Sequence, residues 1–208
     1  MILFDGSGAE FLARVERVER SVVRLTISER RDVDRELPSD VTLGVALPKG
    51  ERQRWLVEKA TELGVSRLVP LVTTRGVAQP TLETLRRLGR AVVEASKQCG
   101  RNRLMQIGEP LGWSDFVQGA RDKGQGAGEA LVRLLAHPGG MSLLNYSNER
   151  SGTFDFVLAV GPEGGFTDPE AQQAADAGWQ AVDLGSRILR VETAAIALVA
   201  AIAVPLPR

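Results

Sequence analysis

Two glycine-rich corners near the C-terminus combine residue types and spacings that could do chemistry. The first is VGPEGGFTDPE at 160–170, and the second begins LGSRILRVETAAIALVAAI at 184–202. The first corner follows an apolar stretch, and both corners lead into helical patterns. Because glycine lets the backbone approach a ligand closely, these corners are compatible with a phosphate cradle, a methyl-donor pocket or plain turns.

The neighbouring residue types separate these alternatives. No G-x-x-x-x-G-K-[ST] pattern occurs in the sequence, which disfavours a P-loop phosphate cradle. Ile188 and Leu189 lie between Arg187 and Arg190 in a segment too short to be a strand. An apolar loop beside a glycine corner can bury an adenine ring, with main-chain groups reading its edge. The alternative that these residues only pack the loop stays open.

Three other features carry weaker signals. The stretch GQGAGE at 124–129 resembles a dinucleotide fingerprint, but no strand precedes it, no helix begins in it and its third glycine is misplaced. His137 and Cys99 are the single histidine and the single cysteine of the chain, and we expect packing roles for both. With one residue of each type, a zinc site or a disulfide framework is not expected, and we predict no metal site.

The elements that must position the corners follow an alternating pattern from residue 41 onwards. Strands are predicted at 41–47, 67–72, 104–107, 130–137, 154–160 and 181–185. Helices are predicted at 51–64, 82–97, 113–121, 167–177 and 192–204. The proline inside 67–72 suggests an edge or irregular strand, and Thr167 with Glu170 forms a capping box for a helix that Gly178 closes.

This alternation predicts an α/β fold with a mostly parallel sheet covered on both faces. Ligands of such sheets bind beyond the carboxyl ends of the strands, and the corners at 161–165 and 184–190 are expected at two of those ends.

The N-terminal part has a different rhythm. Residues 9–28 alternate apolar and charged side chains, which predicts a hairpin with one buried face. That face would hold Phe11, Ala13, Val15, Val23, Leu25 and Ile27. The polar run at 28–40 breaks the pattern, so we divide the chain into domains at 1–38 and 39–208. We expect residues 122–129 to form a flexible loop.

Composition places the chain among ordinary globular proteins. Of its 208 residues, 43% are hydrophobic and 25% are charged. No apolar run reaches the roughly 20 residues of a membrane span, and no secretory signal is visible, so a cytoplasmic protein is expected.

Charge is balanced overall but uneven along the chain. With 26 basic and 26 acidic residues, the chain has no global field for nucleic acid. Between residues 81 and 103, however, the sequence has six basic residues and only two acidic ones. This local excess is compatible with a solvated helix face or with an RNA contact.

Five blocks together resemble the RsmE family, the bacterial 16S ribosomal RNA uridine N3-methyltransferases. They are LPKGERQRWLVEKATELGV, EASKQCGRNR, LLAHP, AVGPEGGFTDPE and LGSRILRVETAAIAL, in order between about 41 and 202. Residues 3–27 are also similar to the last hairpin of that family's small N-terminal barrel. The resemblance implies a SPOUT-type domain with a C-terminal trefoil knot, preceded by a truncated PUA-like barrel, although topology rules would normally exclude a knot.

The resemblance further implies a homodimer with an S-adenosylmethionine pocket built from knot loops at the dimer interface. The cofactor-binding residues carried over are Leu135, His137, Pro138, Gly161, Pro162, Glu163, Gly164, Leu184, Gly185, Ile188, Leu189 and Arg190. The implied partner is 16S ribosomal RNA in the 30S subunit. Its contacts are expected from the N-terminal module and from Arg86, Arg87, Arg90, Lys97, Arg101 and Arg103.

The implied reaction assigns roles to a few polar residues. Uracil N3 is a poor nucleophile until it loses its proton, so the enzyme should stabilise the deprotonated base. Arg190, Arg101 and Asn102 are the expected electrostatic donors. Glu192 would orient an arginine or accept the proton, and an ordinary acidic residue at a helix start is an equal alternative.

The start of the chain departs from the family, whose members carry some forty further residues before LFDG. We expect cofactor binding to survive this difference and substrate recognition to be affected, whether it reflects truncation, a misassigned start or natural loss. A catalytically impaired RNA-binding or assembly protein is therefore the alternative function. A nicotinamide-dependent oxidoreductase would need a proper glycine fingerprint and an acidic ribose ligand, neither of which is found where required.

Overall fold

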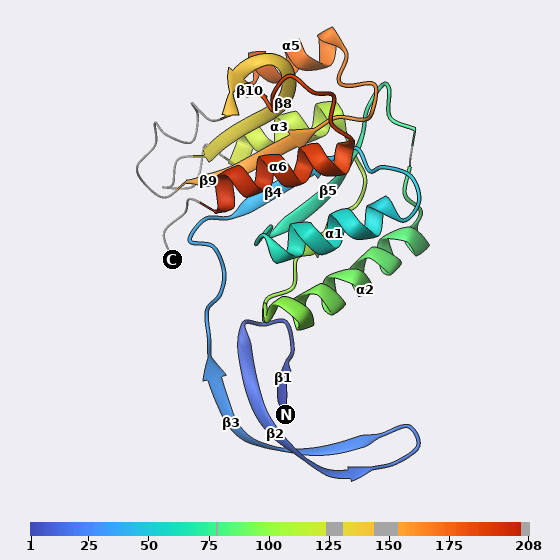
Figure 1. Cartoon of the computed structure of the whole chain (residues 1–208), viewed down its shortest axis with the longest axis vertical. Coiled ribbons are helices and arrows are strands. Elements are labelled where there is room, and N and C mark those ends of the chain that lie inside the picture. Colours follow the sequence, from blue (N-terminus) through green and yellow to red (C-terminus); the bar gives the residue numbers. More distant parts are fainter. Residues whose placement is uncertain (78, 124–130, 144–153, 205–208) are drawn as a thin grey trace.

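The computed structural model describes residues 1–77, 79–123, 131–143 and 154–204, and it contains two β-sheets (Figure 1). A three-stranded N-terminal sheet lies below a larger α/β body in that view. The GQGAGE stretch, most of the loop expected at 122–129 and the last four residues lie outside the described residues. Among the described residues, no helix is both long and apolar enough to cross a membrane.

The larger sheet is parallel throughout, as predicted. Its strands run in the order β10-β8-β9-β4-β5-β6, and β7 also pairs with β5. Their bounds are β4 Val41–Val45, β5 Arg67–Val72, β6 Gln106–Ile107, β7 Leu111–Gly112, β8 Leu131–Ser142, β9 Asp155–Val160 and β10 Gln180–Asp183.

Helices cover both faces of this sheet, which confirms the α/β prediction. They are α1 Arg52–Glu62, α2 Leu82–Cys99, α3 Trp113–Lys123, α5 Asp168–Asp176 and α6 Val191–Ala203. Figure 1 shows α1 and α2 on one side of the sheet and α3 on the other. The side chains of α1, α2 and α6 share one core with Leu158, whereas those of α3 and α5 share another with Ala159. Because successive strand residues point to opposite faces, β9 supplies both cores.

Several local predictions are confirmed. The Thr167–Glu170 capping box opens α5, and Gly178 follows its end with φ +81°. Gly64, with φ +89°, follows α1 in the same way. A positive φ is accessible to glycine without strain, so both helices end at the residues that the sequence indicated.

Of the two alternatives predicted for strand 67–72, the edge position is wrong because β5 lies inside the sheet, whereas an irregular position is confirmed by its interrupted pairing on one side. It pairs with β4 on one side, and with β6 and β7 on the other. The partners β6 and β7 contact residues 67–68 and 71–72 respectively. Pro70 therefore falls in the gap between these two short strands, where β5 has no ladder partner on that side and a missing N–H is tolerated.

The N-terminal sheet consists of β1 Ile2–Phe4, β2 Ala9–Val18 and β3 Val23–Asp32 in antiparallel pairing. The predicted hairpin is confirmed, although β3 extends to residue 32. The expectation of one fully buried face is wrong for the described residues, since Val15, Val23 and Ile27 are 45%, 51% and 57% exposed. The short β1 pairs only with residues 10–12 of β2, so it leaves the far end of the hairpin uncovered.

Candidate functional site

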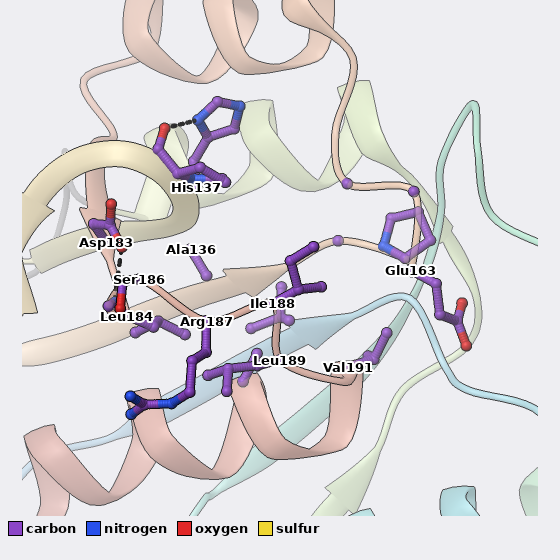
Figure 2. A pocket seen from close by; sticks show the side chains of 18 residues that line it. Ala136, His137, Glu163, Asp183, Leu184, Ser186, Arg187, Ile188, Leu189 and Val191 are labelled. Carbon is purple, nitrogen blue, oxygen red and sulfur yellow. Dashed lines mark hydrogen bonds between the residues drawn. The ribbon is translucent and has the colours of Figure 1, made fainter.

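A cavity of about 400 Å³ lies at the carboxyl ends of β8, β9 and β10 (Figure 2). Three segments line it, namely 136–138, 160–165 and 183–189, together with Val191 and Ala194 from the start of α6. The prediction that the glycine corners lie at the carboxyl edge of the sheet is confirmed. They meet there because parallel strands bring their ends to one edge.

The first segment is part of an outward loop within β8. Leu135 lies opposite Ala181 of β10, but the next β10 residue, Val182, lies opposite Met141, so residues 136–140 leave the ladder with β10, while Ala136 still pairs with Val160 of β9. At Gly140 a Cβ atom would lie 2.5 Å from the carbonyl carbon of Ala181, so only glycine permits this close approach. The loop carries His137, whose Nδ1 lies 2.8 Å from the carbonyl oxygen of Pro138, to the cavity.

The second segment is a tight turn after β9. The N–H of Gly165 donates to the carbonyl of Pro162 at 2.8 Å, and Gly165 has φ +68°. A Cβ at Gly161 would lie 3.0 Å from the ring of Phe166, so the turn packs directly on the α3/α5 core. The glycines therefore act through close packing and backbone conformation, and the turn presents main-chain groups to the cavity.

Asp183 ties the first and third segments together, and the sequence analysis missed it. Its carboxylate accepts the N–H of Gly139 at 3.0 Å and the N–H of Gly185 at 2.8 Å. These two hydrogen bonds, of which the one from Gly139 has the larger effect, hold the pKa of Asp183 below its usual value. Aspartate two residues before glycine is a turn signature, which could have indicated the nearer bond.

The third segment supplies the apolar wall of the cavity. The side chain of Ile188 is fully exposed, and that of Leu189 is half-buried. Val191 and Ala194 continue this wall onto α6, and Figure 2 shows Val191 beside Leu189. Ile188 does not pack its own loop, so the packing alternative fails for this residue.

Comparison with known proteins places the chain. Residues 35–203 match the family model described as RNA methyltransferase domain. A relative from Synechocystis sp., named ribosomal RNA small subunit methyltransferase E, is 35% identical over 201 residues, which cover 93% of this chain and 62% of the relative. A relative of the same name from Mycobacterium tuberculosis is 32% identical over 208 residues, covering 98% and 78%. The chain belongs to the RsmE family.

A solved structure agrees with this assignment. The Neisseria gonorrhoeae ribosomal RNA small subunit methyltransferase E, bound to S-adenosyl methionine, is similar with a TM-score of 0.84 and 32% identity. The similarity covers 97% of this RsmE-family chain and 81% of that chain. The chain thus spans between about three fifths and four fifths of the length of these relatives.

Ten of the twelve residues predicted to bind the cofactor of this RsmE-family chain line the cavity. They are His137, Pro138, Gly161, Pro162, Glu163, Gly164, Leu184, Gly185, Ile188 and Leu189. Leu135 does not line it, because its side chain is buried in the core shared with α3 and α5. Arg190 does not line it either; it is exposed and forms the N-cap of α6, between two residues that do. The expected packing role of His137 is corrected to a place on the cavity wall.

Glu192 lies behind the cavity in the first turn of α6. It is only 7% exposed, and its Oε1 lies 3.7 Å from Nη1 of Arg52. The same guanidinium lies 3.9 Å from Oε1 of Glu163. The arginine within ion-pair distance of Glu192 is therefore Arg52 of α1, which the sequence analysis did not select.

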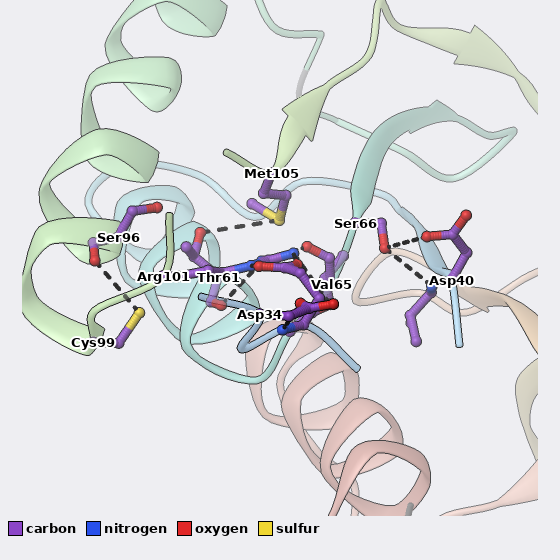
Figure 3. A network of polar contacts seen from close by, with 12 residues as sticks. Asp34, Asp40, Thr61, Val65, Ser66, Ser96, Cys99, Arg101 and Met105 are labelled. Atoms are coloured by element: carbon purple, nitrogen blue, oxygen red, sulfur yellow. Dashed lines mark hydrogen bonds and ion pairs between the residues drawn. The ribbon is translucent and has the colours of Figure 1, made fainter. Parts of the chain in front are cut away.

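Arg101 and Asn102 do not reach the cavity within one chain, which corrects their expected catalytic place. The Arg101 guanidinium donates to Glu36 and to the carbonyls of Thr61 and Val65, near the C-terminal end of α1. Figure 3 shows Arg101 between Thr61 and Val65. The Asn102 amide donates to the carbonyl of Val33. They are 5% and 2% exposed, respectively. Both follow the end of α2, at the edge of the sheet opposite the cavity, so they join the N-terminal module to the α/β body.

The remaining predicted RNA contacts differ in environment. Arg86, Arg87 and Arg90 are exposed on α2, and the ammonium of Lys97 lies 2.8 Å from Glu94. Arg103 is exposed and lies beside the N-terminal sheet. Arg101 is too buried to contact RNA in this conformation. The expected packing role of Cys99 is also wrong, because its side chain is exposed at the end of α2.

Proposed function

We propose that this chain catalyses S-adenosylmethionine-dependent methylation of N3 of a uridine in 16S ribosomal RNA of the 30S subunit. The observation that carries the proposal is the single cavity formed by three sequence-distant loops at the carboxyl edge of the sheet. The RsmE-family relatives are named for ribosomal RNA methylation, and the similar Neisseria structure is bound to S-adenosyl methionine.

The residues present fit this cofactor. A volume of about 400 Å³ lies in the usual range for small-molecule sites. Ile188, Leu189 and Val191 offer an apolar wall for an adenine ring, and the glycine turns offer main-chain donors and acceptors. Asp183 and Glu163 are also among the residues that line the cavity, and the negative charge they bring near it suits a cationic ligand.

For methyl transfer, the protein mainly has to align the base with the methyl donor and stabilise the negative charge of the deprotonated base. S-adenosylmethionine, when bound, supplies a methyl group on a sulfonium cation. Arg190 stands at the cavity edge without a carboxylate partner among the described residues, so its guanidinium is free to stabilise a deprotonated uracil. Glu192 would orient Arg52 or accept the proton; its Oε1 lies 3.7 Å from Arg52, and the buried second carboxylate oxygen has no hydrogen-bond partner among the described residues, which supports a role beyond packing. Arg101 and Asn102 take no part in this reaction within one chain.

We further propose that the chain is a homodimer through a trefoil-knotted C-terminal region. The full exposure of Ile188 at the cavity wall supports a second surface that covers it. The knot loops would be 135–138, 161–165 and 184–190, and the gathering of these segments around one cavity supports that assignment.

We assign residues 1–38 to a PUA-like RNA-binding module and 39–208 to the methyltransferase domain. The separate antiparallel sheet formed by β1, β2 and β3 supports this division. The RNA footprint proposed is the N-terminal sheet together with Arg86, Arg87, Arg90, Lys97 and Arg103. Activity on ribosomal subunits implies a cytoplasmic location.

The test is a calorimetric titration with S-adenosylmethionine, followed by methylation of 30S subunits and mapping of the modified nucleotide. We expect binding, and one methylated uridine that is lost in Arg190→Ala while the circular dichroism spectrum is unchanged. Absence of cofactor binding would overturn the methyltransferase assignment. Binding without methylation would favour the RNA-binding or assembly protein instead, and normal activity of Arg190→Ala would remove this residue from the mechanism.

A further inference from the structure

We infer that Arg75 anchors a phosphate of the RNA backbone at the rim of the cavity. Arg75 lies in the segment that follows β5, far in sequence from the three lining segments. The inference rests on the proposed function and adds to it a substrate-binding residue. The segment after β5 passes beside the loop that carries Glu163 (Figure 2).

Direct contact joins Arg75 to the second lining segment. Its Nη1 donates to the carbonyl of Gly164 at 2.8 Å. Its aliphatic part lies on the same residue, because a Cβ at Gly164 would be 3.3 Å from Cδ of Arg75. The absence of a side chain at Gly164 therefore lets the arginine lie flat against the turn.

The segment that carries Arg75 is itself held in place. Oε1 of Glu170, at the start of α5, accepts the N–H of Thr74 at 2.8 Å. The N–H of Gly76 donates to the carbonyl of Thr73 at 3.0 Å, which closes a turn around Arg75. An arginine whose backbone and side chain are both fixed loses little conformational entropy when it binds a ligand.

The charge of Arg75 is not neutralised within the described residues. Arg52 lies between Glu163 and Glu192, and Arg101 is paired with Glu36. Arg75 has no carboxylate within 4.0 Å among the described residues and is exposed. Its guanidinium has five N–H donors, of which the Gly164 carbonyl takes one. The remaining planar donors match the oxygens of a phosphate.

The location of Arg75 outside the cavity favours a phosphate, and not the target base, as its ligand. The side chain of Arg75 does not line the cavity, from which Gly164 separates it. A base that accepts a methyl group must enter the cavity, whereas its flanking phosphates stay at the rim. The next helix along the chain from Arg75 is α2, which carries the exposed Arg86 and Arg90. An RNA strand bound along these arginines would lead to Arg75 at the rim of the cavity.

The test compares Arg75→Ala, Arg75→Gln and Arg75→Lys with Arg54→Ala as the matched control. Arg54→Ala also removes one exposed arginine, but that arginine is paired with Glu58 at 2.7 Å on α1. Filter binding of 30S subunits across salt concentrations gives the affinity and its salt dependence. Steady-state methylation gives KM and kcat, and calorimetry gives the affinity for S-adenosylmethionine.

We expect Arg75→Ala to weaken 30S binding and raise KM about tenfold, the effect of one lost charge-assisted contact. The slope of log affinity against log salt should fall by about one. Cofactor affinity should stay within about twofold of wild type, as befits a contact made with RNA and not with the cofactor. Arg75→Gln should resemble Arg75→Ala, Arg75→Lys should recover part of the affinity, and Arg54→Ala should leave it unchanged.

The opposite results would overturn the inference. If Arg75→Ala weakens cofactor binding while 30S affinity and the salt slope are unchanged, Arg75 only braces the turn. If it alters kcat and its pH profile alone, the guanidinium acts on the base and not on a phosphate. Because 30S binding is measured without methylation, an inactive wild type would refute the proposed function and still leave the anchor tested.

Discussion

Replacement of Arg101 by alanine tests whether this residue stabilises the fold or takes part in the reaction. Arg101 is 5% exposed, and the carboxylate partner of its guanidinium, Glu36, is 65 residues away in sequence. It also donates to the carbonyls of Thr61 and Val65 at 3.2 and 2.7 Å. Truncation would leave the largely buried carboxylate of Glu36 without its cation and would remove the bonds that join 34–37 to α1.

The expected loss follows from this geometry. Removal of one partner from a buried ion pair costs about 3–5 kcal/mol, because the other charge stays buried and uncompensated. A domain is stable by only about 5–15 kcal/mol, so Arg101→Ala should lose a third or more of its free energy of unfolding. Replacement of both partners by leucine should recover most of the loss, since no charge then remains buried.

Urea unfolding followed by tryptophan fluorescence measures this free energy for each variant. Below the unfolding transition, the cofactor affinity of Arg101→Ala should equal that of the wild type, because the residue lies at the far edge of the sheet from the cavity. The reasoning would be refuted by a variant whose free energy of unfolding falls by less than about 1 kcal/mol while methyl transfer is lost. That result would return Arg101 to the catalytic site.

Variants at two further residues test contacts that hold the segments around the cavity in place. Asp183→Ala should weaken S-adenosylmethionine binding in calorimetry more than Asp183→Asn, because asparagine keeps one acceptor for the N–H of Gly139 or Gly185 and alanine keeps none. Equal affinities in the wild type and both variants would show that the Asp183 hydrogen bonds do not hold the cavity together. For Glu170, burial alone would raise the pKa, but hydrogen bonds from Thr167 and Thr74 outweigh burial and hold the pKa below its ordinary 4.5. The wild type should therefore exceed Glu170→Gln in free energy of unfolding by the largest amount above pH 4.5, and this difference should shrink as the pH falls through the lowered pKa of Glu170. A difference that grows as the pH falls would show that folding raises this pKa instead.

Local sequence patterns predicted much of the fold and part of the cavity lining. The 3.6-residue and 2-residue periodicities predicted the helices and strands of the parallel sheet, because each pattern reports which side of an element is buried. The capping box at Thr167 and the glycines after α1 and α5 act within one turn of chain, so their positions could be read directly. Motifs at strand ends predicted the segments 161–165 and 184–190, whereas the segment with His137 came only from the family resemblance; ten of the twelve residues predicted to bind the cofactor line the cavity.

Tertiary structure decided which side chains serve the site and which serve the fold. Arg101 looked like a catalytic cation in its motif, yet its partner, Glu36, lies 65 residues away and makes it structural. Glu170 meets Thr74 across 96 residues, and Arg75 meets Gly164 across 89. Spacing in sequence determines only which residues share an element, whereas the charge state and availability of a group depend on what the folded chain brings against it. The sequence therefore determined where the cavity lies, and the packing of distant segments decided which cations remain free at its rim.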